Sequence, residues 1–349
     1  MDSPAIMSTV SQEENKSTDW LDSVRWLATI AVITIHVVAP YLYQYGQISN
    51  TDWNIYNLID SLSRFAVPFF VMLSGALLLN RSITLSDFLK KRFIRILIPF
   101  LFWTVAYSIY YFCKSGEIQS SNYLNYFLSS LEDGASYHLW YIYMLIGLYL
   151  AIPILNKWVL NADSNSVLYF LLIWFLGLTI NFFDLNLHKD FSLTIFTGYL
   201  GYLILGYYLA HRSSKFNSYL LLAIFAASIA FTFLATLYYP IANGMFNGKY
   251  YQYLSINVVI ASAALFMLVK NSFSSRGFYL DKIKYCNKYG FGVYLIHVFV
   301  LDALQIFKIN GGFINPIAGT IITIVICYIV SLLLITLLSR IRILANLIN

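Results

Sequence analysis

Two ionisable side chains lie within the first long hydrophobic segment, where each is costly unless it has a partner or a task. Arg25 and His36 are eleven residues apart, so a helix places them on one face, three turns and roughly 16 Å apart along its axis. A neutral imidazole at this depth can remove a proton from a hydroxyl group. Two simpler interpretations stay open here: Arg25 as an interface anchor, and His36 as a hydrogen-bonding group between helices.

A basic cluster stands just before another hydrophobic segment, ahead of Pro99. Within it, Arg92 and Arg95 have i, i+3 spacing and share a helix face, which suits a clamp for phosphate oxygens. Basic residues at a membrane surface also hold topology or contact anionic lipid, and the cluster alone does not separate these roles. Ser74 and Gly75 stand near the end of the preceding hydrophobic segment, where Gly75 is equally suited to close helix packing.

Four further polar residues lie at the outer end or in the interior of their segments. Asp60 and Arg64 are four residues apart near the outer end of one segment and can pair on one helix face. His138 stands among aromatic residues at an expected interface, where it belongs to an aromatic belt or contacts a sugar. His297 lies about 10 Å inside its segment, where it closes a helix contact or takes part in binding.

The sequence lacks the motifs of several other chemistries. Its three cysteines, Cys113, Cys286 and Cys327, form no CxxC pair, so no disulfide framework is expected. No Cys/His metal spacing, phosphate-binding Gly-rich loop or GxSxG motif occurs, and no metal is expected. His188 and His211 are assigned to loops without a role. These residues support proton abstraction by histidine, with arginines that hold a phosphorylated donor.

Membrane helices must position these side chains. Of the 349 residues, 59% are hydrophobic and 11% are charged, and the mean hydropathy is +0.68. A soluble domain carries about a quarter charged residues. In hydrocarbon the backbone polar groups must be satisfied within helices or a closed barrel, and long apolar runs without period-2 alternation exclude the barrel. The predicted fold class is therefore all-α, a polytopic integral membrane protein.

About ten hydrophobic windows are long enough to cross a membrane. They lie near 24–45, 60–80, 95–113, 139–156, 166–184, 193–210, 219–239, 252–270, 289–307 and 316–338. With both termini in the cytoplasm, the inside segments hold 16 Lys and Arg residues and the outside loops hold 4, as the positive-inside rule expects. The net charge of +6 is thus a topology signal, and no nucleic acid is expected as a partner. Residues 1–18 are Ser-rich and are predicted to form a disordered cytoplasmic arm before a transmembrane domain at 19–345.

Four sequence blocks together resemble the acyltransferase-3 family of bacterial membrane proteins. They are LDSVRWLATIAVITIH (21–36), VPFFVMLSG (67–75), RFIRILIP (92–99) and GFGVYLIH (290–297). The blocks occur in the family's order, and the likeness covers essentially the whole hydrophobic part of the chain. Within the family, SRFAVPFFVMLSG and YHLWYIYMLIGLYLAIPIL look closest to the branch that O-acetylates enterobacterial common antigen.

The resemblance implies a ten-helix core in the bacterial inner membrane that transfers an acyl group, usually acetyl from cytoplasmic acetyl-CoA. The acceptor it implies is a hydroxyl of an envelope glycan or of its lipid-linked precursor. By position, His36 matches the family's candidate catalytic histidine and Arg25 its first-helix arginine. Arg92 and Arg95 match the paired arginines that face the donor, and Ser74–Gly75 matches a small pair near the adjoining loop.

From their position in the chain, Arg64, His138 and His297 are expected to contact the acceptor. The expected partners are acyl-CoA, the glycan or lipid-linked sugar, and membrane lipids. Two alternatives stay open: a transporter or flippase for a glycan or acyl precursor, and a structural or partner-binding membrane protein. The lack of a visible internal repeat disfavours the first, and the in-membrane His and Arg residues disfavour the second.

Overall fold

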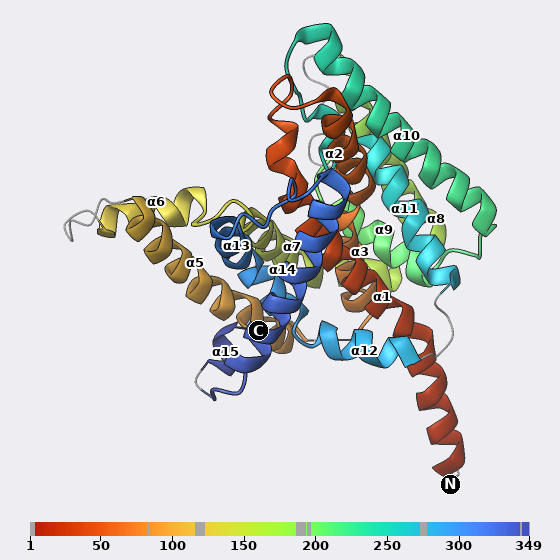
Figure 1. Cartoon of the computed structure of the whole chain (residues 1–349). Coiled ribbons are helices and arrows are strands. Elements are labelled where there is room, and N and C mark those ends of the chain that lie inside the picture. Colours follow the sequence, from red (N-terminus) through yellow and green to blue (C-terminus); the bar gives the residue numbers. More distant parts are fainter. Residues whose placement is uncertain are drawn as a thin grey trace.

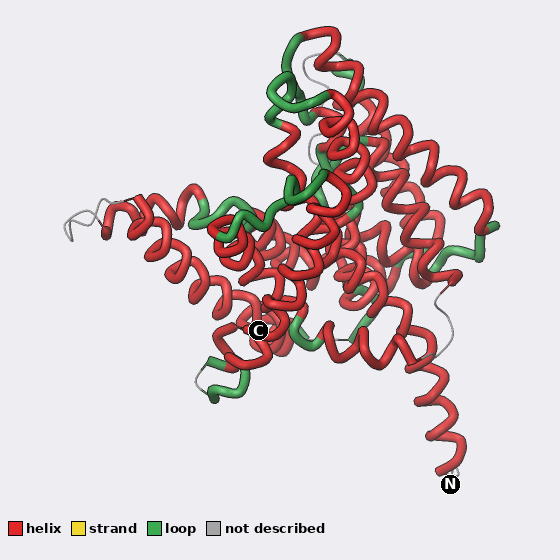
Figure 2. The backbone as a smooth tube through the Cα atoms, in the orientation of Figure 1, coloured by secondary structure: helices red, strands yellow, loops and turns green. Residues whose placement is uncertain are grey.

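The described part of the chain is folded into helices joined by loops (Figures 1 and 2). The computed structural model describes residues 4–82, 84–115, 123–185, 193, 197–272, 278–342 and 344–348, so His188 lies outside them. No strand occurs within these ranges, which confirms the predicted all-α class. The elements are α1 (Pro4–Leu42), α2 (Asn50–Ser63), α3 (Ala66–Leu78), α4 (Leu85–Phe88), the π-helical turn η1 (Leu89–Phe93), α5 (Ile94–Ser115), α6 (Tyr123–Asp133), α7 (Trp140–Asn161), α8 (Ser164–Phe182), α9 (Leu200–His211), α10 (Ser218–Asn243), the 3-10 turn η3 (Lys249–Tyr251), α11 (Ile256–Ser272), α12 (Phe278–Asn287), α13 (Gly290–Ile306), α14 (Pro316–Leu338) and α15 (Ala345–Ile348).

Eight helical stretches of the described chain are long and apolar enough to cross a membrane. The pair α12 and α13, bent by 66° at their junction, adds a ninth if it is counted as one span. Within the remaining predicted window, 193–210, the described residues include α9, whose 12 residues are too few to cross the hydrocarbon alone. Each of the ten predicted windows thus contains a helix, and the chain is a multi-pass membrane protein.

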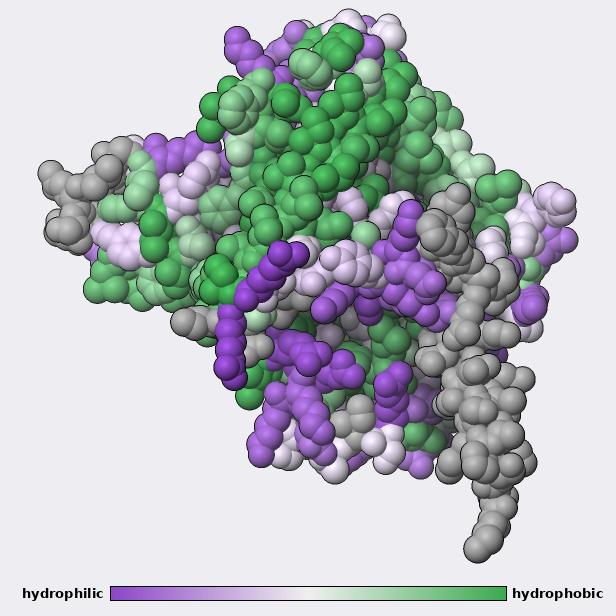
Figure 3. Space-filling view, turned by 60° about the horizontal axis from the view of Figure 1, so that its bottom comes forward, coloured by the Kyte–Doolittle hydropathy of each residue, from purple (hydrophilic) through white to green (hydrophobic). Residues whose placement is uncertain are grey.

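The flank of the helix bundle is apolar, as a surface in contact with lipid must be. Only 22% of the membrane segment of α14 is buried although it is strongly hydrophobic, and its residues Ile321, Val325 and Leu333 are about half exposed. Figure 3 shows hydrophobic side chains over this flank and hydrophilic ones gathered on the end of the bundle that is turned forward. The polar groups that do chemistry must therefore lie inside the bundle or at its ends.

α1 is a central helix and carries both Arg25 and His36. It packs against α2, α3, α11, α12, α13 and α14, and 67% of its membrane segment is buried, against 22% for α14. The helix begins at Pro4, so residues 4–18, for which the sequence predicts a disordered arm, are described as its first turns. This stretch contains Gln, Glu and Lys, whose good helix propensity extends the helix beyond its hydrophobic part.

A break between α2 and α3 places Arg64 outside regular helix. α2 ends at Ser63, the joint consists of Arg64 and Phe65, and α3 begins at Ala66. Both helices together form one membrane-length stretch. Arg64 is held at the joint by an ion pair with buried Asp60, one turn earlier, as the i, i+4 spacing predicts.

α3 and α9 pack at very close range through glycines. A Cβ atom on Gly75 would lie 1.8 Å from the carbonyl oxygen of Leu203, and a Cβ atom on Gly206 would lie 2.1 Å from that of Met72. Both clashes are with backbone atoms, which cannot move aside as a flexible side chain can. Small residues therefore set the distance between these helices, as is common in membrane bundles.

We expect Gly206→Ala to reduce the yield of folded protein and to lower its unfolding temperature in detergent, because α9 must move away from α3. Overpacking of this kind typically costs about 1–3 kcal/mol. Gly147→Ala is the matched control, since a Cβ atom at Gly147 meets nothing within 4 Å. Unfolding of the Gly206 variant at the wild-type temperature would contradict the close packing of α3 and α9.

Candidate active site

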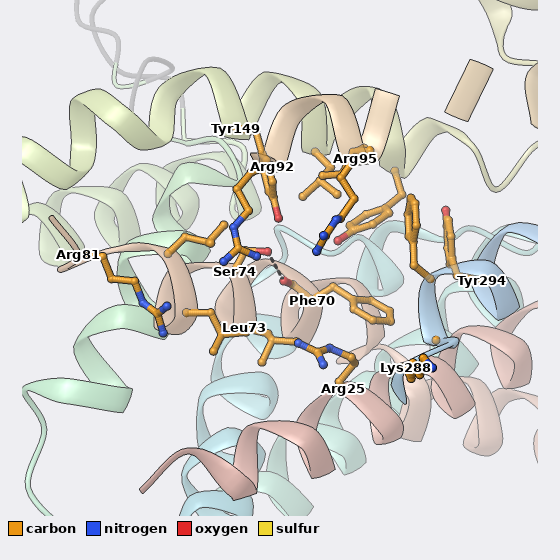
Figure 4. Close-up of a pocket in the computed structure, with 17 residues that line it drawn as sticks. Arg25, Phe70, Leu73, Ser74, Arg81, Arg92, Arg95, Tyr149, Lys288 and Tyr294 are labelled. Atoms are coloured by element: carbon orange, nitrogen blue, oxygen red, sulfur yellow. Dashed lines mark hydrogen bonds between the residues drawn. The ribbon is translucent and has the colours of Figure 1, made fainter. Parts of the chain in front are cut away.

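A cationic cavity opens where the helix ends that are predicted to face the cytoplasm converge. Its volume is about 580 Å³, which is in the range of pockets that hold cofactors and small substrates. Five of its lining residues are basic: Arg25, Arg81, Arg92, Arg95 and Lys288. Figure 4 shows the four guanidinium groups arranged around a common space, although they come from α1, the α3–α4 loop, η1 and α5.

Three of these arginines have no acidic partner among the described residues. Arg81, Arg92 and Arg95 form no ion pair there. The neighbouring Lys91, in contrast, has a side chain that is 74% exposed and pairs with Asp87 at 3.3 Å. Because uncompensated positive charges in a concave site attract anions, and guanidinium groups bind phosphate through paired hydrogen bonds, the cavity is suited to a phosphorylated ligand.

Local structure determines which basic side chains reach the cavity. The π-helical turn η1 winds more widely than an α-helix and leads into α5, where Arg92 and Arg95 line the cavity and Lys91 does not. Asn156 of α7 holds the backbone of Arg81 in place. Its Oδ1 accepts from the Arg81 N–H at 3.2 Å, and its Nδ2 donates to the Arg81 carbonyl at 2.6 Å.

The stretch of α1 from Asp19 to Arg25 is tied to α12, which keeps Arg25 at the cavity. The carboxylate of Asp22 accepts from Arg25 Nη1 at 3.3 Å and from Asn287 Nδ2 at 3.0 Å. Asn287 also donates to the Asp22 carbonyl at 2.8 Å, and Lys284 forms an ion pair with Asp19 at 2.6 Å. These contacts orient the guanidinium group of Arg25 without neutralising the rest of the cavity.

Ser74 and Gly75 are adjacent but serve different surfaces. Ser74 lines the cationic cavity, and its hydroxyl donates to the carbonyl of Phe70 at 3.0 Å (Figure 4). Gly75 is not among the lining residues and lies against Leu203 of α9. The structure thus places Gly75 in helix packing, the alternative that its sequence context left open, and leaves only Ser74 in reach of a ligand.

Three histidines that are far apart in the sequence meet deeper in the bundle. The ring centroid of His36 lies 5.2 Å from that of His297 in α13 and 6.4 Å from that of His138, in the turn before α7. The rings of His138 and His297 are 5.1 Å apart, and Tyr137 packs against His36 at 5.0 Å. Among the described residues, no group of three or more His, Cys, Asp or Glu side chains is arranged to hold a metal ion.

His138 and His297, the two histidines around His36, are almost completely buried. In each of them only one ring nitrogen has a hydrogen-bond partner among the described residues. His297 Nδ1 lies 2.6 Å from the carbonyl oxygen of Tyr294, and His138 Nδ1 lies 3.1 Å from Ser136 Oγ. The Nε2 atoms of both rings have no hydrogen-bond partner within the described residues. The Tyr294 hydroxyl donates to the His138 carbonyl, which links α13 to the turn before α7. His36 itself is only partly buried.

An aromatic partition separates His36 from the cationic cavity. A small pocket of about 20 Å³ is lined by His36 and His138 and shares Phe70, Tyr141 and Tyr294 with that cavity. The centroids of these three rings lie 5.5 to 6.4 Å apart. A donor arm that reaches His36 from the cationic cavity has to pass these rings.

A third cavity, of about 490 Å³, lies beyond the small pocket and shares Trp140 and Tyr253 with it. Its lining is largely aromatic, and Arg64 is the one basic residue among the described residues that line it. Arg64 Nε donates to buried Asp60 at 2.5 Å, and its guanidinium lies 4.3 Å from the ring centroid of Tyr251. The charge in this cavity is therefore already compensated, unlike the charge in the cationic cavity.

Most of the sequence-predicted residues thus lie at three cavities that share lining residues. Arg25, Arg92, Arg95 and Ser74 line the cationic cavity, His36 and His138 the small pocket, and Arg64 the aromatic cavity, while His297 contacts the His36 ring.

Sequence reasoning missed several residues of the site. In the sequence, Arg81 and Lys288 count only among the 16 basic residues of the inside segments, although they stand at the same predicted membrane face as Arg25. The partition residues Tyr141 and Tyr294 lie in sequence blocks that were noted for their histidines. The positive charge of Arg81 and Lys288 at the same membrane face as Arg25 was therefore the sequence feature that could have identified them. No comparable feature identified Tyr141 and Tyr294.

The chain is a multi-pass membrane protein in which a small pocket lined by His36 lies between a cationic and an aromatic cavity. The profile of the acyltransferase-3 family, described as an acyltransferase domain, matches residues 18–340, and the chain belongs to this family. The match includes every candidate residue above, from Arg25 to His297, so the protein is a membrane acyltransferase. No curated protein and no solved structure matches the chain.

Proposed function

We propose that the protein transfers an acetyl group from cytoplasmic acetyl-CoA to a hydroxyl of an envelope glycan, or of its lipid-linked precursor, at the bacterial inner membrane. The observation that carries this proposal is the position of His36 between a cationic and an aromatic cavity. A transfer between an anionic donor and a sugar needs a binding site for each, with a base where the two meet.

The cationic cavity supports a donor with phosphate groups. Coenzyme A carries its phosphates at the end remote from the thioester, and Arg81, Arg92 and Arg95 offer guanidinium groups without acidic partners in the described chain. Arg25 adds charge on the α1 side of the same space. With its phosphates held there, the linear arm of coenzyme A would extend past Ser74 to the aromatic partition and bring the thioester toward His36.

His36 is the proposed general base. Its neutral imidazole takes the proton of the acceptor hydroxyl while the hydroxyl oxygen attacks the thioester carbonyl. The C–O bond of the new ester forms, the C–S bond breaks, and the proton passes from His36 to the departing sulfur. The products are the acetylated sugar and the free thiol of coenzyme A, so His36 returns to its neutral state.

The aromatic cavity supports a sugar as the acceptor. Trp140, Tyr199 and Phe246 line it, and aromatic faces stack on the apolar faces of sugar rings. Gln252 and Arg64 add hydrogen-bonding groups for hydroxyls. The resemblance of two sequence blocks to the branch that O-acetylates enterobacterial common antigen points to the same class of acceptor.

Mass spectrometry of surface and lipid-linked glycans from cells with and without the gene tests the proposal. We expect the glycan to be made and exported in both strains, and to lose the mass of its acetyl groups only when the gene is absent. Loss of glycan export with acetylation intact would favour a transporter or flippase instead.

The size of the His36 pocket predicts a preference for short acyl groups. Val32, Ile35 and Val67 form its aliphatic wall. One extra methylene in a closed apolar pocket changes the binding free energy by about 1–3 kcal/mol. We therefore expect the kcat/KM for acetyl-CoA to be about tenfold or more higher than that for butyryl-CoA. Val67→Ala should narrow this ratio, because it enlarges the pocket.

Val71→Ala is the matched control for this prediction. Val71 is buried one turn further along α3 but does not line the His36 pocket, so its substitution should leave the donor ratio unchanged. Equal use of both donors by the wild-type protein would show that the pocket does not select acyl length.

A further inference from the structure

We propose that His297 is a positioning residue for His36. In this role its Nε2 accepts a hydrogen bond from one ring nitrogen of His36 and leaves the other nitrogen of His36 free to act as the base. The inference rests on the proposed function, in which His36 takes the proton of the acceptor hydroxyl. It gives His297 a role in orienting the base instead of the acceptor contact that its depth in the helix had suggested.

The hydrogen bond at the other side of the ring determines which nitrogen of His297 carries the hydrogen. His297 Nδ1 lies 2.6 Å from the carbonyl oxygen of Tyr294, and a carbonyl oxygen can only accept. Nδ1 is therefore the protonated nitrogen, and Nε2 of the neutral ring carries a lone pair. Because Tyr294 precedes His297 by three residues in α13, this arrangement is built into one helix.

The lone pair on His297 Nε2 is buried without a donor. The residue has no exposed surface, and Nε2 has no hydrogen-bond partner within the described residues. Buried polar atoms in folded proteins are nearly always paired, so an unpaired one calls for a functional explanation. The ring of His36 lies 5.2 Å away by centroid, with 35° between the ring planes. The proposed hydrogen bond forms when His36 turns about its side-chain bonds so that one N–H points at this atom.

His138 is a weaker candidate for the same role. Its ring centroid lies 6.4 Å from that of His36, further than the ring of His297. Its Nδ1 partner is a serine hydroxyl, which both donates and accepts, so the position of the ring hydrogen is not determined by this contact. Only His297 combines the shorter distance to His36 with a lone pair whose place is fixed.

The expected benefit for catalysis is a fixed orientation of the base. With one nitrogen donating to His297, His36 directs its other nitrogen, as a lone pair, toward the small pocket. When His36 accepts the proton of the hydroxyl, its other N–H stays hydrogen-bonded to His297 Nε2. The positive charge of the His36 imidazolium is therefore stabilised by an acceptor that is already in place. The proton then leaves for the thiol sulfur, and both rings return to their starting states.

Two substitutions of His297 separate this role from the others. His297→Gln keeps an acceptor near the position of Nε2, whereas His297→Asn keeps a donor near the position of Nδ1 and loses that acceptor. We expect the Gln variant to retain most of the wild-type kcat and the Asn variant to lose it on the order of 100-fold, as when a catalytic histidine loses the group that orients it. The KM values for acetyl-CoA and for the glycan should not change in either.

The outcomes that would overturn the proposal differ in kind. A higher KM for the glycan at unchanged kcat would make His297 a substrate contact, and full activity of the Asn variant would leave it without a role. An equal loss of kcat in the Gln and Asn variants would indicate that His297 has a purely structural role. Wild type and His36→Ala are measured alongside: no acetyl transfer by the wild type refutes the proposed function, whereas an active wild type with an equally active Asn variant refutes only this inference.

Nuclear magnetic resonance of ¹⁵N-histidine-labelled protein in detergent gives a readout that needs no activity and no folded variant at position 297. The wild type should contain one histidine protonated at Nδ1, the less common form in water, whose Nε2 is hydrogen-bonded to a second histidine ring. In the His36→Ala variant, the resonances of the second ring and the hydrogen bond to it should be lost. The histidine protonated at Nδ1 should remain. A His297 ring protonated at Nε2 would overturn the proposal.

Discussion

The His36→Ala variant should lose acetyl transfer by roughly 10²–10⁴-fold, the contribution typical of a positioned general base, and still insert and accumulate in the membrane. The reason is that His36 is the partly accessible histidine of the cluster, in the pocket that adjoins both larger cavities. His138 lines the same pocket, but it is almost completely buried and its Nδ1 contacts Ser136, so we expect it not to replace His36. The measurement is transfer of label from radioactive acetyl-CoA to glycan, at matched amounts of membrane protein.

His211→Gln is the matched control for this experiment. His211 also lies in the bundle, where its Nε2 contacts the carbonyl of Ala76 at 2.8 Å, but it lines none of the three cavities. A glutamine amide can still donate to that carbonyl, so activity should be close to that of the wild type. Full activity of the His36→Ala variant would remove this residue from the mechanism.

The double substitution of Arg92 and Arg95 by alanine should have the second largest effect, on donor binding. Hydrogen bonds to charged groups contribute about 1.5–3 kcal/mol each, so each arginine lost should raise the KM for acetyl-CoA roughly tenfold or more. The kcat at saturating donor should change little, because these groups bind the phosphates and not the thioester. Higher salt should weaken donor binding more in the wild type than in the variant.

Lys91→Ala is the control for charge alone. Lys91 is next to Arg92 but is exposed, paired with Asp87 and outside the cavity, so its loss should leave the KM for acetyl-CoA unchanged. Lysine in place of Arg92 and Arg95 should restore part of the affinity, since it keeps the charge but not the paired hydrogen bonds. A double alanine variant with the wild-type KM for acetyl-CoA would show that the donor phosphates bind elsewhere.

The transmembrane character of the chain followed from the sequence because crossing the hydrocarbon is a local requirement of about 20 apolar residues. The same rule explains where the prediction and the fold differ. The window 193–210 is apolar enough to be predicted as a span, and its described residues include α9, a helix of 12 residues that packs through glycines on α3. Hydropathy registers burial in protein and burial in lipid alike, so it cannot tell such a helix from a span.

For the site, spacing along one helix was enough to place Arg25 above His36 on α1 and to pair Arg92 with Arg95, since neighbours within a helix depend only on its 3.6-residue repeat. The surroundings of His36 came from the tertiary structure alone. His138 and His297 reach His36, and Arg81 reaches the cationic cavity, only because the folded bundle brings together α1, α13, the turn before α7 and the α3–α4 loop. Lipid tails are as apolar as leucine side chains, so hydropathy does not distinguish a helix face that meets lipid from one that meets another helix, and the identity of neighbouring helices is decided by close packing in three dimensions.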